Sequence, residues 1–155
     1  MSNVGVIAFT PSLGVVVMNV SGSCHCGAIR FTATVDKNKV MVCHCTDCQK
    51  LTGSAFRVVV PAPIASLVLH GEPKRYVKTA DSGAKRTQAF CPECGSPVFA
   101  IALENPTQVS LRVGSLDQRN ELLPYLQIWQ QSALPWVNTI ASVQGCEQQQ
   151  FLSLQ

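Results

Sequence analysis

The stretch Cys43-His44-Cys45-Thr46-Asp47-Cys48 brings three thiols within six residues. Structural zinc sites are closed by four protein ligands, whereas catalytic zinc sites keep three and leave one position for water or substrate. The spacing therefore predicts an open zinc site held by Cys43, Cys45 and Cys48. Two alternatives remain at this point: a second structural zinc completed by Cys146 or a histidine, or a trio of reduced thiols without metal.

Two more pairs of cysteines flank this stretch, Cys24 and Cys26 before it and Cys91 and Cys94 after it. The order Cys-Pro-x-Cys-Gly of the later pair is typical of a zinc-knuckle turn, in which proline and glycine shape a tight reversal around one metal. Short local pairs also suit a metal better than disulfides between distant loops. We therefore expect two zinc ions per chain, one in a closed structural site and one in an open site.

The composition indicates one globular domain, since 155 residues of which 46% are hydrophobic can build a single core. The formal charge of +3 falls to about zero once seven thiolates bind two zinc ions. The basic residues are scattered and only 6% of residues are aromatic. A nucleic-acid partner is therefore not expected.

The apolar N-terminal segment lacks the basic region of a signal peptide, because the first basic residue is Arg30. This segment of about 17 residues is also marginal for a membrane span. We expect a cytoplasmic protein without a membrane partner, and the sequence sets no oligomeric state. Residues 1–17 are either an added hairpin or edge strand or, as we favour, an extension that the fold does not need. Residues 18–140 would then form the zinc domain, and residues 141–155 a glutamine-rich tail.

The pattern along the chain is mainly β, without a long helical period. Apolar and polar residues alternate over residues 29–35, and residues 40–42 are expected to return as the second strand of a hairpin. Thr46 to Gln49 has the form of a capping box, which predicts a short helix with Thr46 as N-cap that ends near Gly53. Cys48 in its first turn would be favoured as a thiolate by the helix dipole. Further strands are expected at residues 55–60, 64–69, 75–78, 86–90, 98–102, 109–114 and 126–129.

Four motifs follow one another between residues 22 and 137: Gly22-Ser23-Cys24-His25-Cys26-Gly27, Cys43-His44-Cys45-Thr46-Asp47-Cys48 with Thr52-Gly53-Ser54-Ala55-Phe56, Phe90-Cys91-Pro92-Glu93-Cys94-Gly95-Ser96, and Gly114-Ser115-Leu116-Asp117. In this order they resemble the glutathione-dependent formaldehyde-activating enzyme (GFA) family. The resemblance implies a single mainly β domain of small, coiled antiparallel sheets, like that of the Mss4 protein.

The resemblance also implies the ligands and the reaction. Cys24, Cys26, Cys91 and Cys94 would hold the structural zinc, and Cys43, Cys45 and Cys48 the catalytic one. The implied activity is that of a carbon-sulfur lyase, which joins formaldehyde and the thiol of glutathione or separates them. A non-catalytic Mss4-like binding module is the alternative, and it would have no need for the middle three thiols.

Other residues have expected roles near the open site. Arg57, Arg86 and Arg112 are candidates for binding substrate carboxylates, since the guanidinium fork matches a carboxylate. His25 and His44 are expected to pack beside the ligands rather than to bind metal, because a side chain between two cysteines in an extended segment points away from them. Four further expectations concern single residues: Asp47 carries the charge of the helix start rather than acting as a base, Gln127 replaces a histidine common in similar proteins and cannot shuttle a proton, Cys146 is a bystander, and Trp129 and Trp136 lie in the core.

Overall fold

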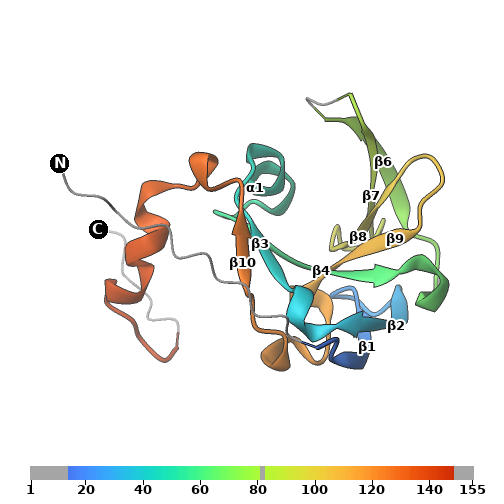
Figure 1. Ribbon diagram of the computed structural model, residues 1–155, viewed down its shortest axis with the longest axis horizontal. Coiled ribbons are helices and arrows are strands. Elements are labelled where there is room, and N and C mark those ends of the chain that lie inside the picture. The colour runs from blue at the N-terminus through green and yellow to red at the C-terminus, as the bar shows by residue number, and fades with distance from the viewer. Residues whose placement is uncertain (1–13, 81–82, 149–155) are drawn as a thin grey trace.

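The computed structural model describes residues 14–80 and 83–148 of the chain. Its strands form two sheets, which confirms the expected mainly β fold (Figure 1). The smaller sheet is antiparallel, in the order β1 (Val17–Ser23), β2 (Arg30–Asp36) and β5 (Val68–His70).

The larger sheet has seven strands, and all its neighbours are antiparallel except β10 and β3. Its order is β10 (Leu126–Ile128), β3 (Met41–Cys43), β4 (Arg57–Pro63), β9 (Gln108–Arg112), β8 (Pro97–Ala102), β7 (Lys85–Phe90) and β6 (Lys74–Thr79).

A short α-helix, α1 (Thr46–Thr52), follows β3. The other helical segments of the described residues are 3-10 helices: η1 (Lys37–Lys39), η2 (Ile64–Ser66), η3 (Val113–Ser115), η4 (Arg119–Glu121), η5 (Gln130–Ser132) and η6 (Pro135–Ser142). No helix within residues 14–80 and 83–148 combines the length and the apolar character that a membrane span requires.

The core lies between the two sheets. Alternate residues of β2, among them Phe31 and Val35, are buried against Val60 of β4 and Leu111 of β9. The same cluster of buried residues contains Cys91, which lies directly after β7. One cysteine pair is therefore anchored in the core rather than in a surface loop.

The prediction of a hairpin between residues 29–35 and 40–42 is wrong. Both strands are present, but they do not pair with each other. One edge of β2 pairs with β5 and the other with β1, a strand that the sequence analysis does not predict and whose more buried positions include Met18, Val20 and Gly22. Because both edges of β2 are taken, η1 carries the chain into the second sheet, where β3 pairs with β4 and β10.

The N-terminal residues that we had set apart are described only in part. Residues 1–13 lie outside the described residues. Val17 opens β1 and pairs with Asp36, and the carbonyl of Val16 accepts a hydrogen bond from the backbone N–H of Lys37 at 3.0 Å. The strand of the smaller sheet thus begins at the end of the segment that we expected to be dispensable.

Three local expectations also differ from the structure. The strand expected at residues 55–60 continues through Pro61 to Pro63, where β4 has passed the end of β3 and pairs with β9 alone. Proline is tolerated there because no ladder hydrogen bond is needed on that side. The strand expected at residues 64–69 begins with η2 and contains only β5. Trp129 and Trp136 are about half exposed, so the prediction that they lie in the core is wrong. The other expected strands are confirmed to within three residues.

Gly71 directly follows β5 and lies against Ala28, in the turn that carries the first cysteine pair. Its φ is +89°, and a Cβ atom there would lie 2.3 Å from the carbonyl oxygen of Ala28. We expect Gly71→Ala to lower the free energy of unfolding by about 3 kcal/mol, because a left-handed backbone and a backbone clash both oppose the side chain. Denaturant unfolding of the zinc-loaded protein measures this loss.

Gly53→Ala is the matched control for this change. Gly53 is also left-handed, with φ +61°, but nothing lies within 4 Å of the position of its Cβ. Its expected loss is about 1 kcal/mol, from the backbone conformation alone. Equal losses in the two variants would contradict the clash at Gly71.

Candidate metal centres

Four thiols from two distant turns meet at one point of the fold. The sulfurs of Cys24, Cys26, Cys91 and Cys94 all lie within 4.8 Å of one another. The Cys26 sulfur is 3.6 Å from that of Cys24 and 3.7 Å from that of Cys91. A tetrahedral zinc with sulfur at about 2.3 Å has edges of about 3.8 Å between its ligands. The donor type, number and spacing therefore fit a closed metal site.

Each of the two turns is built in a similar way. After the first cysteine of each turn, a left-handed glycine donates its N–H to the carbonyl of that cysteine: Gly27 to Cys24 at 3.1 Å, and Gly95 to Cys91 at 2.9 Å. The N–H of Ile29 also donates to the sulfur of Cys24 at 3.2 Å. Glycine at these positions lets the chain reverse without strain, so both sulfurs of a turn point the same way.

Ser96 links the two turns. Its hydroxyl oxygen accepts the N–H of His25 at 3.0 Å and lies 3.2 Å from the sulfur of Cys94. The hydrogen bond between the hydroxyl of Ser96 and the sulfur of Cys94 lowers the pKa of Cys94 to about 5. The thiolate form that a metal requires is thus favoured at Cys94 by a neighbour outside the cysteine motif.

The second cluster contains the thiols of Cys43, Cys45 and Cys48, all within 4.8 Å of one another. Cys43 ends β3, and its sulfur lies 3.5 Å from that of Cys45. Cys45 is the N-cap of α1 in place of the expected Thr46, because its sulfur accepts the N–H of Cys48 at 3.4 Å. The helix ends at left-handed Gly53, as predicted.

The protonation of this trio differs from the sequence-based expectation. A hydrogen bond from Cys48 lowers the pKa of Cys43 to about 5, and the charge of Arg57 adds to this effect. The same hydrogen bond, together with burial, raises the pKa of Cys48 well above its ordinary value. Without metal, the contact between these two sulfurs thus favours the thiolate form at Cys43 and the thiol form at Cys48.

His44 stands between Cys43 and Cys45 in the sequence, and it is 1% exposed. Its Nε2 is 2.8 Å from Oε1 of Gln127, and its ring meets the ring of Phe56 edge-on. Gln49 donates to the carbonyls of His44 and Ser132, at 2.7 and 2.8 Å. Two residues in and just after β10, Gln127 and Ser132, therefore bind the segment Cys43 to Gln49 through hydrogen bonds. Gln127 is the hydrogen-bond partner of His44.

Neither metal cluster of the described residues includes His25, His44 or Cys146. Cys146 is exposed. The ring of His44 is turned to Gln127, as described above. The closure of the second site by a fourth protein ligand, which the sequence left open, is thus not seen in residues 14–80 and 83–148.

Two of the three candidate arginines are brought together beside this cluster. Arg57 pairs with Cys43 across the sheet, and the side chains of Arg57 and Arg112 both donate to Oε1 of Gln88, at 3.2 and 2.7 Å. They are only 5% and 6% exposed. Burial, and next the charge of Arg57, lower the pKa of Arg112 to about 9. Arg86 lies two residues from Gln88 on β7 and is exposed.

A cavity of about 600 Å³ lies against both arginines and the closed cluster. Its wall includes Cys24, His25, Ser96, Thr52, Phe56, Arg57, Arg112, Asp117 and Arg119. Arg119 is a cation that the sequence reasoning missed, because nothing in its surroundings marks it except its position two residues after the Gly-Ser-Leu-Asp motif. The cavity thus has a cationic wall, and Arg57 is shared between this wall and the surroundings of Cys43.

A comparison with known proteins identifies the family. The family described as "Glutathione-dependent formaldehyde-activating enzyme" matches residues 19–132. The chain belongs to the GFA family. A crystal structure of a Rhodobacter sphaeroides protein is similar at 20% sequence identity with a TM-score of 0.52, over 69% of this chain and 98% of that chain. At this identity the likeness supports the fold.

Within this GFA chain, Asp47 forms an ion pair. Its carboxylate pairs with the ammonium group of Lys78 on β6. β6 is the edge strand at the end of the larger sheet that lies farther from β3. The ion pair therefore joins α1, which follows β3, to the opposite end of the sheet. The reading of Asp47 as a charge at the helix start, rather than as a base, agrees with this contact.

Proposed function

We propose that this GFA chain is a zinc-dependent carbon-sulfur lyase that joins an aldehyde such as formaldehyde to a small thiol such as glutathione, or separates them. The observation that carries the proposal is the trio of Cys43, Cys45 and Cys48, gathered within 4.8 Å beside two buried arginines. Three sulfur ligands leave one tetrahedral position for a reactant. Membership of the family, by its name, supports the same substrates.

The two clusters have different proposed tasks. Cys24, Cys26, Cys91 and Cys94 hold a structural zinc, whose role is to fix the fold. A zinc held by the three-thiol cluster would supply Lewis acidity and favour the thiolate form of a bound thiol. The reaction needs no oxidant: a sulfur–carbon bond forms, and the proton of the thiol goes to the carbonyl oxygen.

The residues around the second cluster have a positioning role in this proposal. Arg57 and Arg112, with the more exposed Arg86 as a third candidate, bind carboxylates of the thiol substrate. Holding two reactants together raises their effective concentration, which is the main gain available for an addition that also occurs without a catalyst. His44, fixed by Gln127, keeps the cysteine loop in place. We also propose a cytoplasmic location, because seven free thiols in metal clusters suit a reducing compartment.

Exchange spectroscopy by NMR tests the reaction. The rate of interconversion of formaldehyde and S-hydroxymethylglutathione is measured with zinc-loaded protein and in buffer alone. We expect a higher rate with protein, in proportion to its concentration. A rate equal to that in buffer would remove the proposed reaction and favour the binding-module alternative, while the assignment of the metal clusters would stand.

A further inference from the structure

The chain leaves the two sheets after β10 and continues as an arm. The C-terminal arm, residues 129–148, contains η5 and η6 and lies on the outer side of β10, away from the smaller sheet (Figure 1). The carbonyl of Ser132 accepts a hydrogen bond from Gln49 of α1 at 2.8 Å. From Ala133 on, the hydrogen bonds of the described residues stay within the arm, such as that from the N–H of Val143 to the carbonyl of Ile140 at 3.2 Å. Hydrogen bonds thus fix the start of the arm to the domain, but not η6.

This part of the chain is exposed but carries no charge. The 25 residues from Leu122 to Cys146 include no Asp, Glu, Lys, Arg or His. None of residues 123–148 is buried, whereas the surface of a soluble protein carries charged side chains at about a quarter of its positions or more. The polar side chains that are present are hydroxyls and amides, and the amides of the arm include Gln130, Gln131, Asn138 and Gln144.

Large apolar side chains are exposed in the same segment. Of the fourteen that are exposed among the described residues, seven lie between residues 123 and 143. In η6 the three-residue period of a 3-10 helix places Val137 and Ile140 one above the other, and Val143 follows. The seven residues, here called the apolar surface, are Leu123, Tyr125, Leu126, Trp129, Trp136, Ile140 and Val143.

The area of the apolar surface matches what a stable dimer needs. Its seven residues are between 42% and 73% exposed. At these fractions they present about 800 Å², which is the area that each partner contributes to a standard protein–protein interface. The largest apolar patch of a typical monomer measures only roughly 300–600 Å². The apolar surface is therefore large enough to be an interface.

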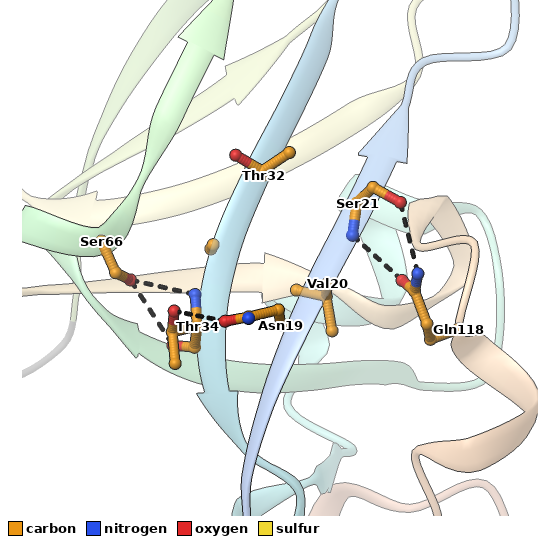
Figure 2. Close-up of a pocket in the computed structure, with 8 residues that line it drawn as sticks. Asn19, Val20, Ser21, Thr32, Thr34, Ser66 and Gln118 are labelled. Carbon is orange, nitrogen blue, oxygen red and sulfur yellow. Dashed lines mark hydrogen bonds between the residues drawn. The ribbon is translucent and has the colours of Figure 1, made fainter.

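A different surface of the protein shows how exposed groups are satisfied without a partner. Figure 2 shows a pocket of about 430 Å³ on the smaller sheet. Its polar side chains bond to one another: the hydroxyl of Thr34 donates to Asn19 at 3.0 Å, and the amide of Gln118 donates to the hydroxyl of Ser21 at 3.3 Å. Water is a good solvent for such a wall, whereas the apolar surface gains free energy when it is covered.

The chemistry of the apolar surface and its surroundings fits a second copy of the same chain. A two-fold interface brings the same patch together from both partners, so charged residues within it would meet their like. A surface without charge avoids this repulsion, and amide side chains can pair with their own kind because each both donates and accepts. A different protein partner is ordinarily selected by complementary charge, and a membrane-surface segment carries Lys or Arg; residues 122–146 offer neither. We propose that the apolar surface is the interface of a homodimer.

Sedimentation velocity of the zinc-loaded chain tests this interface. We expect a dimer at about 10 μM protein, since interfaces of this size bind with micromolar affinity or better. Ile140→Lys should raise the dissociation constant of the dimer at least a hundredfold, because a two-fold interface then contains two like charges. A wild-type chain that is folded and monomeric at this concentration overturns the proposal.

Val68→Lys is the matched control. Val68 lies on β5 of the smaller sheet and is 53% exposed, as Ile140 is, but it does not belong to the apolar surface. Its dissociation constant should stay within twofold of the wild-type value. Equal effects of the two lysines, or dissociation by Val68→Lys alone, would place the interface elsewhere and overturn the proposal.

Tryptophan fluorescence gives a second readout, because both tryptophans of the chain, Trp129 and Trp136, belong to the apolar surface. Dilution of the dimer should shift their emission to longer wavelength as they become exposed to water, and Ile140→Lys should show the shifted emission at every concentration. A dimer whose emission does not change on dilution would have its interface elsewhere, which contradicts the proposal. Neither readout involves formaldehyde or glutathione, so the outcome is independent of the proposed reaction.

Discussion

Cys91→Ser is expected to abolish the cooperative unfolding transition of the domain. Cys91 is fully buried, belongs to the hydrophobic core, and contributes one of four sulfurs to the closed cluster. Binding of a structural zinc is worth about 10 kcal/mol or more in small domains, which is comparable to the whole stability of a protein of this size. Circular dichroism during denaturation, together with zinc content, measures the outcome.

Cys146→Ser is the control for this loss. Cys146 is exposed and lies outside both clusters, so the free energy of unfolding should change by less than about 0.5 kcal/mol. If Cys91→Ser unfolds at the denaturant concentration of the wild type, the four-thiol cluster does not carry the fold.

Cys45→Ser is expected to reduce the zinc content from two ions to one per chain and to remove the acceleration of formaldehyde exchange, while the fold persists. Serine is a strong N-cap, so its hydroxyl can accept the N–H of Cys48 as the sulfur of Cys45 does. The start of α1 is therefore preserved, and the variant isolates the loss of a metal ligand. Elemental analysis of the purified protein and the NMR exchange rate give the two readouts.

Two results would contradict this expectation. One zinc ion in the wild type would exclude two occupied sites. Two zinc ions in Cys45→Ser would show that Cys45 is not a ligand, and the trio would lose its proposed role.

The cysteine clusters are the part of the site that a sequence can reveal best. Within Cys43 to Cys48 and Cys91 to Cys94 the spacing alone keeps the sulfurs close, and the glycines that follow the outer pairs indicate tight turns. The proton distribution among Cys43, Cys45 and Cys48 is different, because it depends on which two sulfurs come into hydrogen-bond contact. Contact between particular sulfurs is a property of three-dimensional geometry, and the spacing of the cysteines does not reveal it.

The arginines illustrate why strand register matters. Arg57, Arg86 and Arg112 are equivalent candidates in the sequence, each in a strand near a motif. The register places Arg57 beside Cys43 and Arg112 beside Val59, so that both side chains meet Gln88. Without knowledge of which strands pair, neither their burial nor the role of Gln88 could be predicted.

The main difference between the predicted and the observed fold also concerns strand pairing. The alternation of residues 30–36 predicts a strand correctly, but not its neighbours. Ser21, Gly22 and Ser23 weaken the β pattern of β1, so the sequence does not mark β1 as the partner of β2. Local pattern fixes what an element is, whereas long-range contacts decide where it packs.

The closed cluster joins a turn that follows β1 of the small sheet to a turn that follows β7 of the large one, and 65 residues separate Cys26 from Cys91. A cross-link over such a loop lowers the entropy of the unfolded chain by an amount worth roughly 4 kcal/mol. Residues 43–48 lie inside this loop. A metal bound by the four outer cysteines would therefore also restrict the unfolded chain that carries the three-thiol cluster, so loss of the closed site would weaken the second site without touching any of its ligands.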